Sequence, residues 1–216
     1  MSALATRWSS LRAALTASGI MIVLSHAVGA VTWVASANAS LRTFDLSTIQ
    51  SVSDNPDGYI IPLFGMLLGV GLMGFVARGM RPRAPQAARM LFIAVALFVV
   101  NAVATYLLPD VWRIHAFLAR VSFIMLIISQ IGFFRHYAMR VDRYIAWGTL
   151  VAAVVLFVLP TYFSFDLVMH VAGVDVSVIL GLCEVAYLGI MYTGMYRVIR
   201  TAEQETSRSP IVGQTT

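Results

Sequence analysis

Residues 59–83, YIIPLFGMLLGVGLMGFVARGMRPR, join a long apolar run to a cluster of arginines. The nineteen residues 59–77 carry no charge, and arginines follow at positions 78, 81 and 83. The hydrocarbon core of a bilayer is about 30 Å thick and is crossed by about 20 apolar helical residues. Arginine resists translocation and stays on the cytoplasmic side of a membrane. This stretch therefore predicts a transmembrane helix whose carboxyl end faces the cytoplasm.

Five further apolar stretches accompany this one, and together the six predicted spans are residues 17–36, 59–78, 89–108, 112–134, 144–163 and 174–196. Hydrophobic residues make up 59% of the 216 residues, and charged residues make up only 12%. A typical soluble domain has about 25% charged residues. The sequence therefore predicts an all-α polytopic membrane protein in which residues 17–200 form a single six-helix transmembrane bundle.

All fifteen basic residues are arginine, and their distribution predicts the orientation of the bundle. Twelve lie at the N-terminus, in or beside the loops that follow the second and fourth spans, or after the sixth span: Arg7, Arg12, Arg78, Arg81, Arg83, Arg89, Arg135, Arg140, Arg143, Arg197, Arg200 and Arg208. Only Arg42 and Arg113 flank the opposite side. This asymmetry predicts cytoplasmic termini (N-in and C-in) in a cell membrane, and we expect a prokaryotic plasma membrane. The net charge of +5 follows from this pattern and does not indicate nucleic-acid binding.

The two ends of the chain differ in composition from the spans. Residues 1–16 form a short, basic cytoplasmic lead-in, and residues 201–216 form a polar cytoplasmic tail that we expect to be disordered. Arg7 and Arg12 before an apolar run, with Ala35-Ser36-Ala37 after it, resemble a signal peptide and its cleavage site. The run is longer than a signal core of about 7–15 residues, which favours an uncleaved helix. Cleavage would leave five helices and an external N-terminus.

Five polar residues fall within the predicted spans: His26, Asn101, His115, Arg120 and Glu184. At about 1.5 Å per helical residue, all five lie in the outer half of the membrane. Ionisable groups at this depth are costly and mark either a functional site or a buried partner. Arg120 and Glu184 have opposite charges at matching depths, so we expect them to pair. The pair either holds two helices together or lines a pocket that opens outward.

The longest predicted loop, residues 37–58, contains a turn cluster that includes Ser53 and Asp54. Loops longer than about 12–15 residues often cover a functional site. Ser53 and Asp54 are therefore candidate ligand-binding residues, together with His26 and Asn101. The alternative is that this loop is only a solvated connector.

Metal and cofactor chemistry finds little support in the sequence. His26 and His115 could ligate a haem between them, although a hydrogen-bonded packing role is favoured for His26. Cys183 is the single cysteine, and no His-x-x-x-His spacing occurs. We therefore expect no metal site, and haem is the one cofactor left open.

Gly65 and Gly69 form a pair of small residues spaced four apart in the second predicted span. Such a pair allows two helices to approach closely. The contact is expected either within the bundle or in a homodimer formed through this face.

Three short motifs resemble a family of six-helix membrane proteins known as domain of unknown function 998. The first is the segment Ser47-Thr-Ile-Gln-Ser-Val-Ser-Asp54 before the second span. The second is Arg113-Ile-His115-Ala-Phe-Leu-Ala at the start of the fourth span, and the third is Gly181-Leu-Cys-Glu184 in the sixth. In that family an arginine usually follows the glutamate, whereas Val185 follows here. The resemblance implies the fold and a shared site in the outer half, and it implies no activity.

Two functions are compatible with these residues. The first is an integral membrane enzyme acting on a lipid or isoprenoid, because a carboxyl group in apolar surroundings keeps its proton and can act as a general acid. Glu184 would then start an acid-initiated reaction such as terpene cyclisation, with His115, Arg120 and Asn101 orienting the substrate. The alternative is a non-catalytic lipid-binding protein, a small transporter or a partner subunit.

Overall fold

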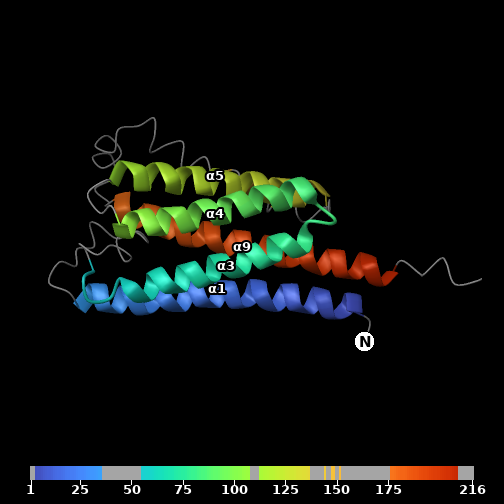
Figure 1. Ribbon diagram of the computed structural model, residues 1–216, viewed down its shortest axis with the longest axis horizontal. Coiled ribbons are helices and arrows are strands. Elements are labelled where there is room, and N and C mark those ends of the chain that lie inside the picture. The colour runs from blue at the N-terminus through green and yellow to red at the C-terminus, as the bar shows by residue number, and fades with distance from the viewer. Residues whose placement is uncertain are drawn as a thin grey trace, which may run out of the picture.

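The computed structural model describes residues 3–35, 55–107, 112–136 and 176–208, together with residues 144, 147, 148 and 151. It contains the helices α1 (Ala3–Ala35), α3 (Ile60–Met80), α4 (Pro85–Leu107), α5 (Trp112–His136) and α9 (Val176–Arg208) (Figure 1). No strand occurs among the residues that the structure describes. The prediction of an all-α protein is therefore confirmed for this part of the chain.

Four segments within these helices are long and apolar enough to cross a membrane: Arg7–Ala35, Ile60–Met80, Pro85–Ala104 and Phe117–Arg135. They correspond to the first four predicted spans. The fifth predicted span, 144–163, lies almost entirely outside the described residues, and the sixth, 174–196, falls mostly within α9. The four segments indicate a helical membrane protein.

The helices form two antiparallel pairs with a fifth helix between them. α1 pairs with α3, α4 pairs with α5, and α9 lies between the two pairs (Figure 1). The N-terminus, the turn from α3 to α4 and the carboxyl end of α9 lie at one end of the bundle (Figure 1). Gly132, near the carboxyl end of α5, packs on Ala87 at the start of α4, so α5 ends there as well. We call this end of the molecule the arginine end.

Arginine side chains hold the helices together at the arginine end. Arg12 of α1 forms an ion pair with Glu203 of α9, with 3.2 Å between the nitrogen and oxygen atoms. Arg83 in the α3–α4 turn donates a hydrogen bond of 2.7 Å to the carbonyl oxygen of Ala202. The Arg83 guanidinium also lies over the Trp8 ring, 4.7 Å from its centroid, a favourable cation–π distance. The basic residues at this end therefore have a structural role beyond setting the orientation.

The helices extend further than the predicted spans at both ends of the chain. α1 and α9 each have 33 residues, or about 50 Å of helix at 1.5 Å per residue. This length exceeds the hydrocarbon core of about 30 Å. Residues 3–16 belong to α1, with Trp8 buried, and α9 continues to Arg208, with Ala202 buried. The expected lead-in and the first part of the expected tail are thus helical, and Trp8 and Ala202 within them belong to the buried core.

Small residues bring α1 and α3 into close contact. A Cβ atom on Gly65 would overlap the Ser25 side chain, and one on Gly69 would lie 2.6 Å from Cγ1 of Ile22. Close contacts recur along the pair at Thr32 with Gly58, Ser25 with Gly65, and Leu11 with Gly79, at intervals of seven and then fourteen residues. Both glycines of the predicted small-residue pair are buried in this contact. The close approach therefore occurs within the chain, the first of the two arrangements expected for Gly65 and Gly69.

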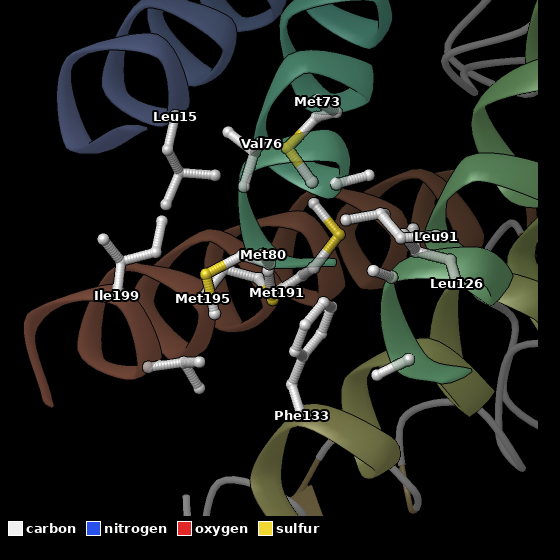
Figure 2. Close-up of a cluster of buried hydrophobic side chains, with 14 of the residues drawn as sticks. Leu15, Met73, Val76, Met80, Leu91, Leu126, Phe133, Met191, Met195 and Ile199 are labelled. Carbon is white, nitrogen blue, oxygen red and sulfur yellow. The ribbon is translucent and has the colours of Figure 1, made fainter. Parts of the chain in front are cut away.

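The polar and apolar side chains are distributed as expected for a protein surrounded by lipid. The buried polar residues include Ser18, Ser25, His26, Asn101, Ser122, Ser129 and Gln130. Large apolar side chains cover the outer faces, among them Val23, Leu24, Val31, Phe64, Leu68, Phe75, Phe92 and Phe117. Figure 2 shows the core, where Met73 and Met80 of α3 meet Met191 and Met195 of α9. An apolar exterior of this extent marks a surface that contacts lipid or a partner rather than water.

Candidate functional site

A partly open cavity of about 110 Å³ lies where all five described helices meet. Its walls are formed by Ile22, His26, Met66, Val70, Met73, Leu91, Ala94, Val95, Phe98, Asn101, Ala119, Phe123, Leu126, Leu188, Met191 and Tyr192. Most of these side chains are apolar, and the polar atoms come from three residues on three different helices. The cavity is therefore an apolar chamber with a few fixed polar groups, which is the usual character of a small-molecule site.

The shape of the cavity follows from the residue types around it. Ala94 of α4 and Ala119 of α5 have short side chains and leave space between their helices. Met66, Met73 and Met191 line other walls. Methionine is unbranched and flexible, so it adapts to irregular contents more readily than a branched side chain. The lining can therefore adjust to a bound apolar group.

His26 is buried in α1 and lines the cavity. Its Nδ1 atom lies 2.7 Å from the carbonyl oxygen of Ile22, one turn earlier in the same helix. A carbonyl oxygen only accepts hydrogen bonds, so Nδ1 carries a proton. This bond fixes the orientation of the imidazole ring.

Asn101 of α4 is the second buried polar residue of the cavity wall. It lies one helical turn beyond Phe98, on the same face of α4. Within α1 and α4, His26 and Asn101 are the lining residues farthest from the arginine end. They therefore give that end of the cavity its polar character.

Tyr192 contributes a third polar group, which is tied to two other helices. The Ser18 hydroxyl lies 2.7 Å from the Gly69 carbonyl oxygen and 2.6 Å from the Tyr192 hydroxyl. Ser18 has one proton, and the carbonyl can only accept it, so Tyr192 must donate its own proton to Ser18. This relay joins α9, α1 and α3 beside the cavity and fixes the Tyr192 ring in its wall.

Three aromatic rings connect α4, α5 and α9 next to the cavity. The centroids of Phe98 and Phe123 lie 5.1 Å apart, with an interplanar angle of 85°. Phe123 and Tyr187 are 5.8 Å apart at 70°. Both are edge-to-face contacts, which are favourable for aromatic pairs. They hold one wall of the cavity in a defined geometry.

The structure brings together two of the predicted site residues, because His26 and Asn101 line the same cavity. His115 and Arg120 lie on α5 and Glu184 lies on α9, but their side chains are outside the described part of the molecule. Ser53 and Asp54 are also outside the described residues. The Arg120–Glu184 ion pair and the roles of these five residues therefore stay predictions.

Helix register relates two of these positions to the cavity. Position 115 precedes Ala119 by one turn of α5, and position 184 precedes Leu188 by one turn of α9. Residues four apart lie on the same face of a helix. Ala119 and Leu188 both line the cavity. Positions 115 and 184 thus belong to the helix faces that form the cavity walls.

Ser18 and Asn55 were not among the residues predicted from the sequence, and the hydrogen bond of Tyr192 was not predicted either. Asn55 is fully buried, and its side-chain amide donates to the carbonyl oxygen of Gly29 (3.2 Å) and to the Thr32 hydroxyl (3.3 Å). The seven-residue spacing of Ser18, Ser25 and Thr32 could have indicated a polar contact face, because it places small polar residues on one face of α1.

No cluster of three or more His, Cys, Asp or Glu side chains occurs among the residues that the structure describes. The cavity volume of about 110 Å³ is below the range of about 300–1,000 Å³ that is typical of pockets for small molecules and cofactors alike, so the cavity holds only part of such a molecule. No family model, curated protein or solved structure matches the chain.

Proposed function

We propose that this chain is a six-helix protein of the cell membrane that holds the end of a lipid or isoprenoid chain in its intramembrane cavity. The observation that carries the proposal is the composition of the cavity wall. The wall is apolar and rich in methionine, with His26 and Asn101 at one end. An apolar molecule with a polar terminus matches this pattern, because its chain would contact the wall and its terminus would contact the two polar residues.

The six-span arrangement with cytoplasmic termini is part of the proposal. α5 ends at the arginine end, whereas α9 begins at the opposite end of the bundle (Figure 1). We propose that the chain between these helices crosses the membrane once more. The apolar residues 144–163 are long enough for this crossing. The arginines gathered at one end then place that end in the cytoplasm.

A cavity-filling variant tests the binding proposal. Ala94 is fully buried in the cavity wall, and Ala96 is exposed two residues further along α4. We expect Ala94→Leu to abolish co-purification of a lipid or isoprenoid, measured by mass spectrometry of extracts from the purified protein. Ala96→Leu adds the same atoms outside the cavity and should retain the molecule. Equal retention in both variants would show that the cavity is not the binding site.

An enzyme is the second candidate, and the helix register favours it. Positions 115 and 184 lie on the faces of α5 and α9 that form the cavity walls. Glu184 would act as the general acid, with His115, Arg120 and Asn101 orienting an isoprenoid substrate. Glu184→Gln should then abolish turnover of a supplied isoprenoid while the purified protein still binds it. Unchanged product formation by this variant would exclude the acid mechanism.

Membership of the family known as domain of unknown function 998 remains a proposal. It rests on three short motifs, which are Ser47–Asp54, Arg113–Ala119 and Gly181–Glu184. The family's shared site would coincide with the polar end of the cavity.

A further inference from the structure

We propose that a cleft between α3 and α4 at the arginine end binds the phosphate-bearing headgroup of an anionic phospholipid. The cleft has a volume of about 760 Å³ and is separate from the cavity between the five helices. Arg78, Arg81 and Arg89 line its polar part, and Phe92 and Ile93 line its apolar part. Three guanidinium groups next to an apolar wall match a phospholipid, in which a phosphate adjoins acyl chains.

Among the described residues, the three cleft arginines differ from their neighbours in having no hydrogen-bond or ion-pair partner. Other arginines at this end are used internally, as in the contacts of Arg7 with the Gly79 carbonyl, Arg12 with Glu203, and Arg83 with the Ala202 carbonyl. Arg78, Arg81 and Arg89 are exposed, and within the described part of the chain none has a hydrogen bond or an ion pair. Their donors therefore remain available for a phosphate, which guanidinium groups bind in a bidentate manner.

The start of α4 adds further positive potential to the cleft. α4 begins at Pro85, and Pro85 and Gln86 both line the cleft. The first backbone amides of a helix lack partners within the helix, and the helix dipole is positive at this end. Both features favour an anion beside the arginines.

The apolar wall identifies the ligand as a lipid rather than free phosphate. Arg89, Phe92 and Ile93 are spaced three and four apart, so they lie along one face of α4. Phe92 is 57% exposed and Ile93 is 38% exposed. A phospholipid whose phosphate is bound by Arg89 would thus place its acyl chains along Phe92 and Ile93, toward the middle of the bundle. Free phosphate would make no use of this wall.

Lipid binding to matched charge variants tests the site. Arg81→Gln/Arg89→Gln removes two charges from the cleft, and Arg197→Gln/Arg200→Gln removes two exposed charges from α9 at the same end. Binding of phosphatidylglycerol and phosphatidylcholine to the purified protein is measured by native mass spectrometry. Each arginine near an anionic lipid contributes about fivefold to binding, so the cleft variant should bind phosphatidylglycerol on the order of 20-fold more weakly. Phosphatidylcholine binding should change little.

Equal losses in the two double variants would overturn the proposal, because they would show a general charge effect. Arg81→Lys/Arg89→Lys keeps both charges and should recover most of the binding, which separates loss of the site from loss of folding. Phe92→Ala should weaken phosphatidylglycerol binding, whereas Phe64→Ala, on the exposed face of α3, should not. Displacement of phosphatidylglycerol by millimolar inorganic phosphate would assign the cleft to free phosphate and would also overturn the proposal.

Discussion

Gly65 of α3 lies directly against Ser25 of α1, so closely that no side chain fits between the two helices. Similar close contacts recur seven residues away at Thr32 with Gly58 and, in the other direction, fourteen residues away at Leu11 with Gly79. Helices in a membrane associate through packing and hydrogen bonds, because burying apolar surface gains little in lipid. This contact fixes α1 on α3 and thereby holds His26 at the cavity.

Enlarging Gly65 tests the importance of this close contact. Gly65→Ala should lower thermal stability strongly, by about 1–3 kcal/mol of unfolding free energy, because the added Cβ overlaps Ser25. Gly71 is the matched control on the same helix, since a Cβ there meets nothing within 4 Å. Gly71→Ala should have little effect, and it can raise helix stability. Equal melting temperatures for the two variants would contradict the helix register.

The Ser18–Tyr192 hydrogen bond is expected to couple α1 to α9 across the cavity. Ser18→Ala and Tyr192→Phe should each lower stability by about 1 kcal/mol, and the double variant should lose less than the sum. The measurement is thermal unfolding in detergent. Tyr196→Phe serves as the control, because Tyr196 is on the same helix and is 39% exposed. Additive losses from Ser18→Ala and Tyr192→Phe would show that the hydroxyl groups do not interact.

The predicted ion pair between Arg120 and Glu184 is an alternative to the general-acid role, because a paired Glu184 is ionised, and it calls for a double-mutant cycle. Removing one partner of a buried pair typically costs about 3–5 kcal/mol, because the other charge is left uncompensated. Glu184→Gln and Arg120→Met should each destabilise the protein, and together they should lose less than the sum. Strict additivity would exclude direct pairing of the two side chains.

Membrane orientation can be tested by cysteine labelling on a Cys183→Ala background. Arg81, at the arginine end, and Asp57, before α3, are both exposed and lie at opposite ends of α3. Asp57→Cys should react with an impermeant maleimide on intact cells, whereas Arg81→Cys should react only after permeabilisation. The reverse pattern would place the arginine end outside the cell and overturn the proposed orientation.

The sequence was sufficient to predict the helical class and the first four spans, because apolar length and charge placement are local properties. It also identified His26 and Asn101, because an ionisable or amide group within a span is conspicuous. The hydrogen bond between Ser18 and Tyr192 was not predicted, since hydroxyl groups occur throughout these helices and their pairing depends on how α1 and α9 pack. The cavity volume could not be predicted either, because it depends on how side chains from five helices fit together.

The extension of α1 was equally hidden from sequence analysis. Residues 1–16 are basic because of Arg7 and Arg12, and this composition predicted a lead-in that precedes the bundle. Here Glu203 pairs with Arg12, and Trp8 packs beneath Arg83. These partners come from distant parts of the chain, so no local pattern indicates them.

Photolabelling with a diazirine-bearing isoprenoid alcohol tests the central claim most directly, because it shows where an apolar chain resides in the bundle. The labelled residues are identified by peptide mass spectrometry. We predict labelling at cavity-wall residues of α4 and α9, such as Val95, Phe98 and Met191, and its loss in Ala94→Leu. Labelling confined to lipid-facing residues such as Val99 and Val103, and unchanged in Ala94→Leu, would contradict the account.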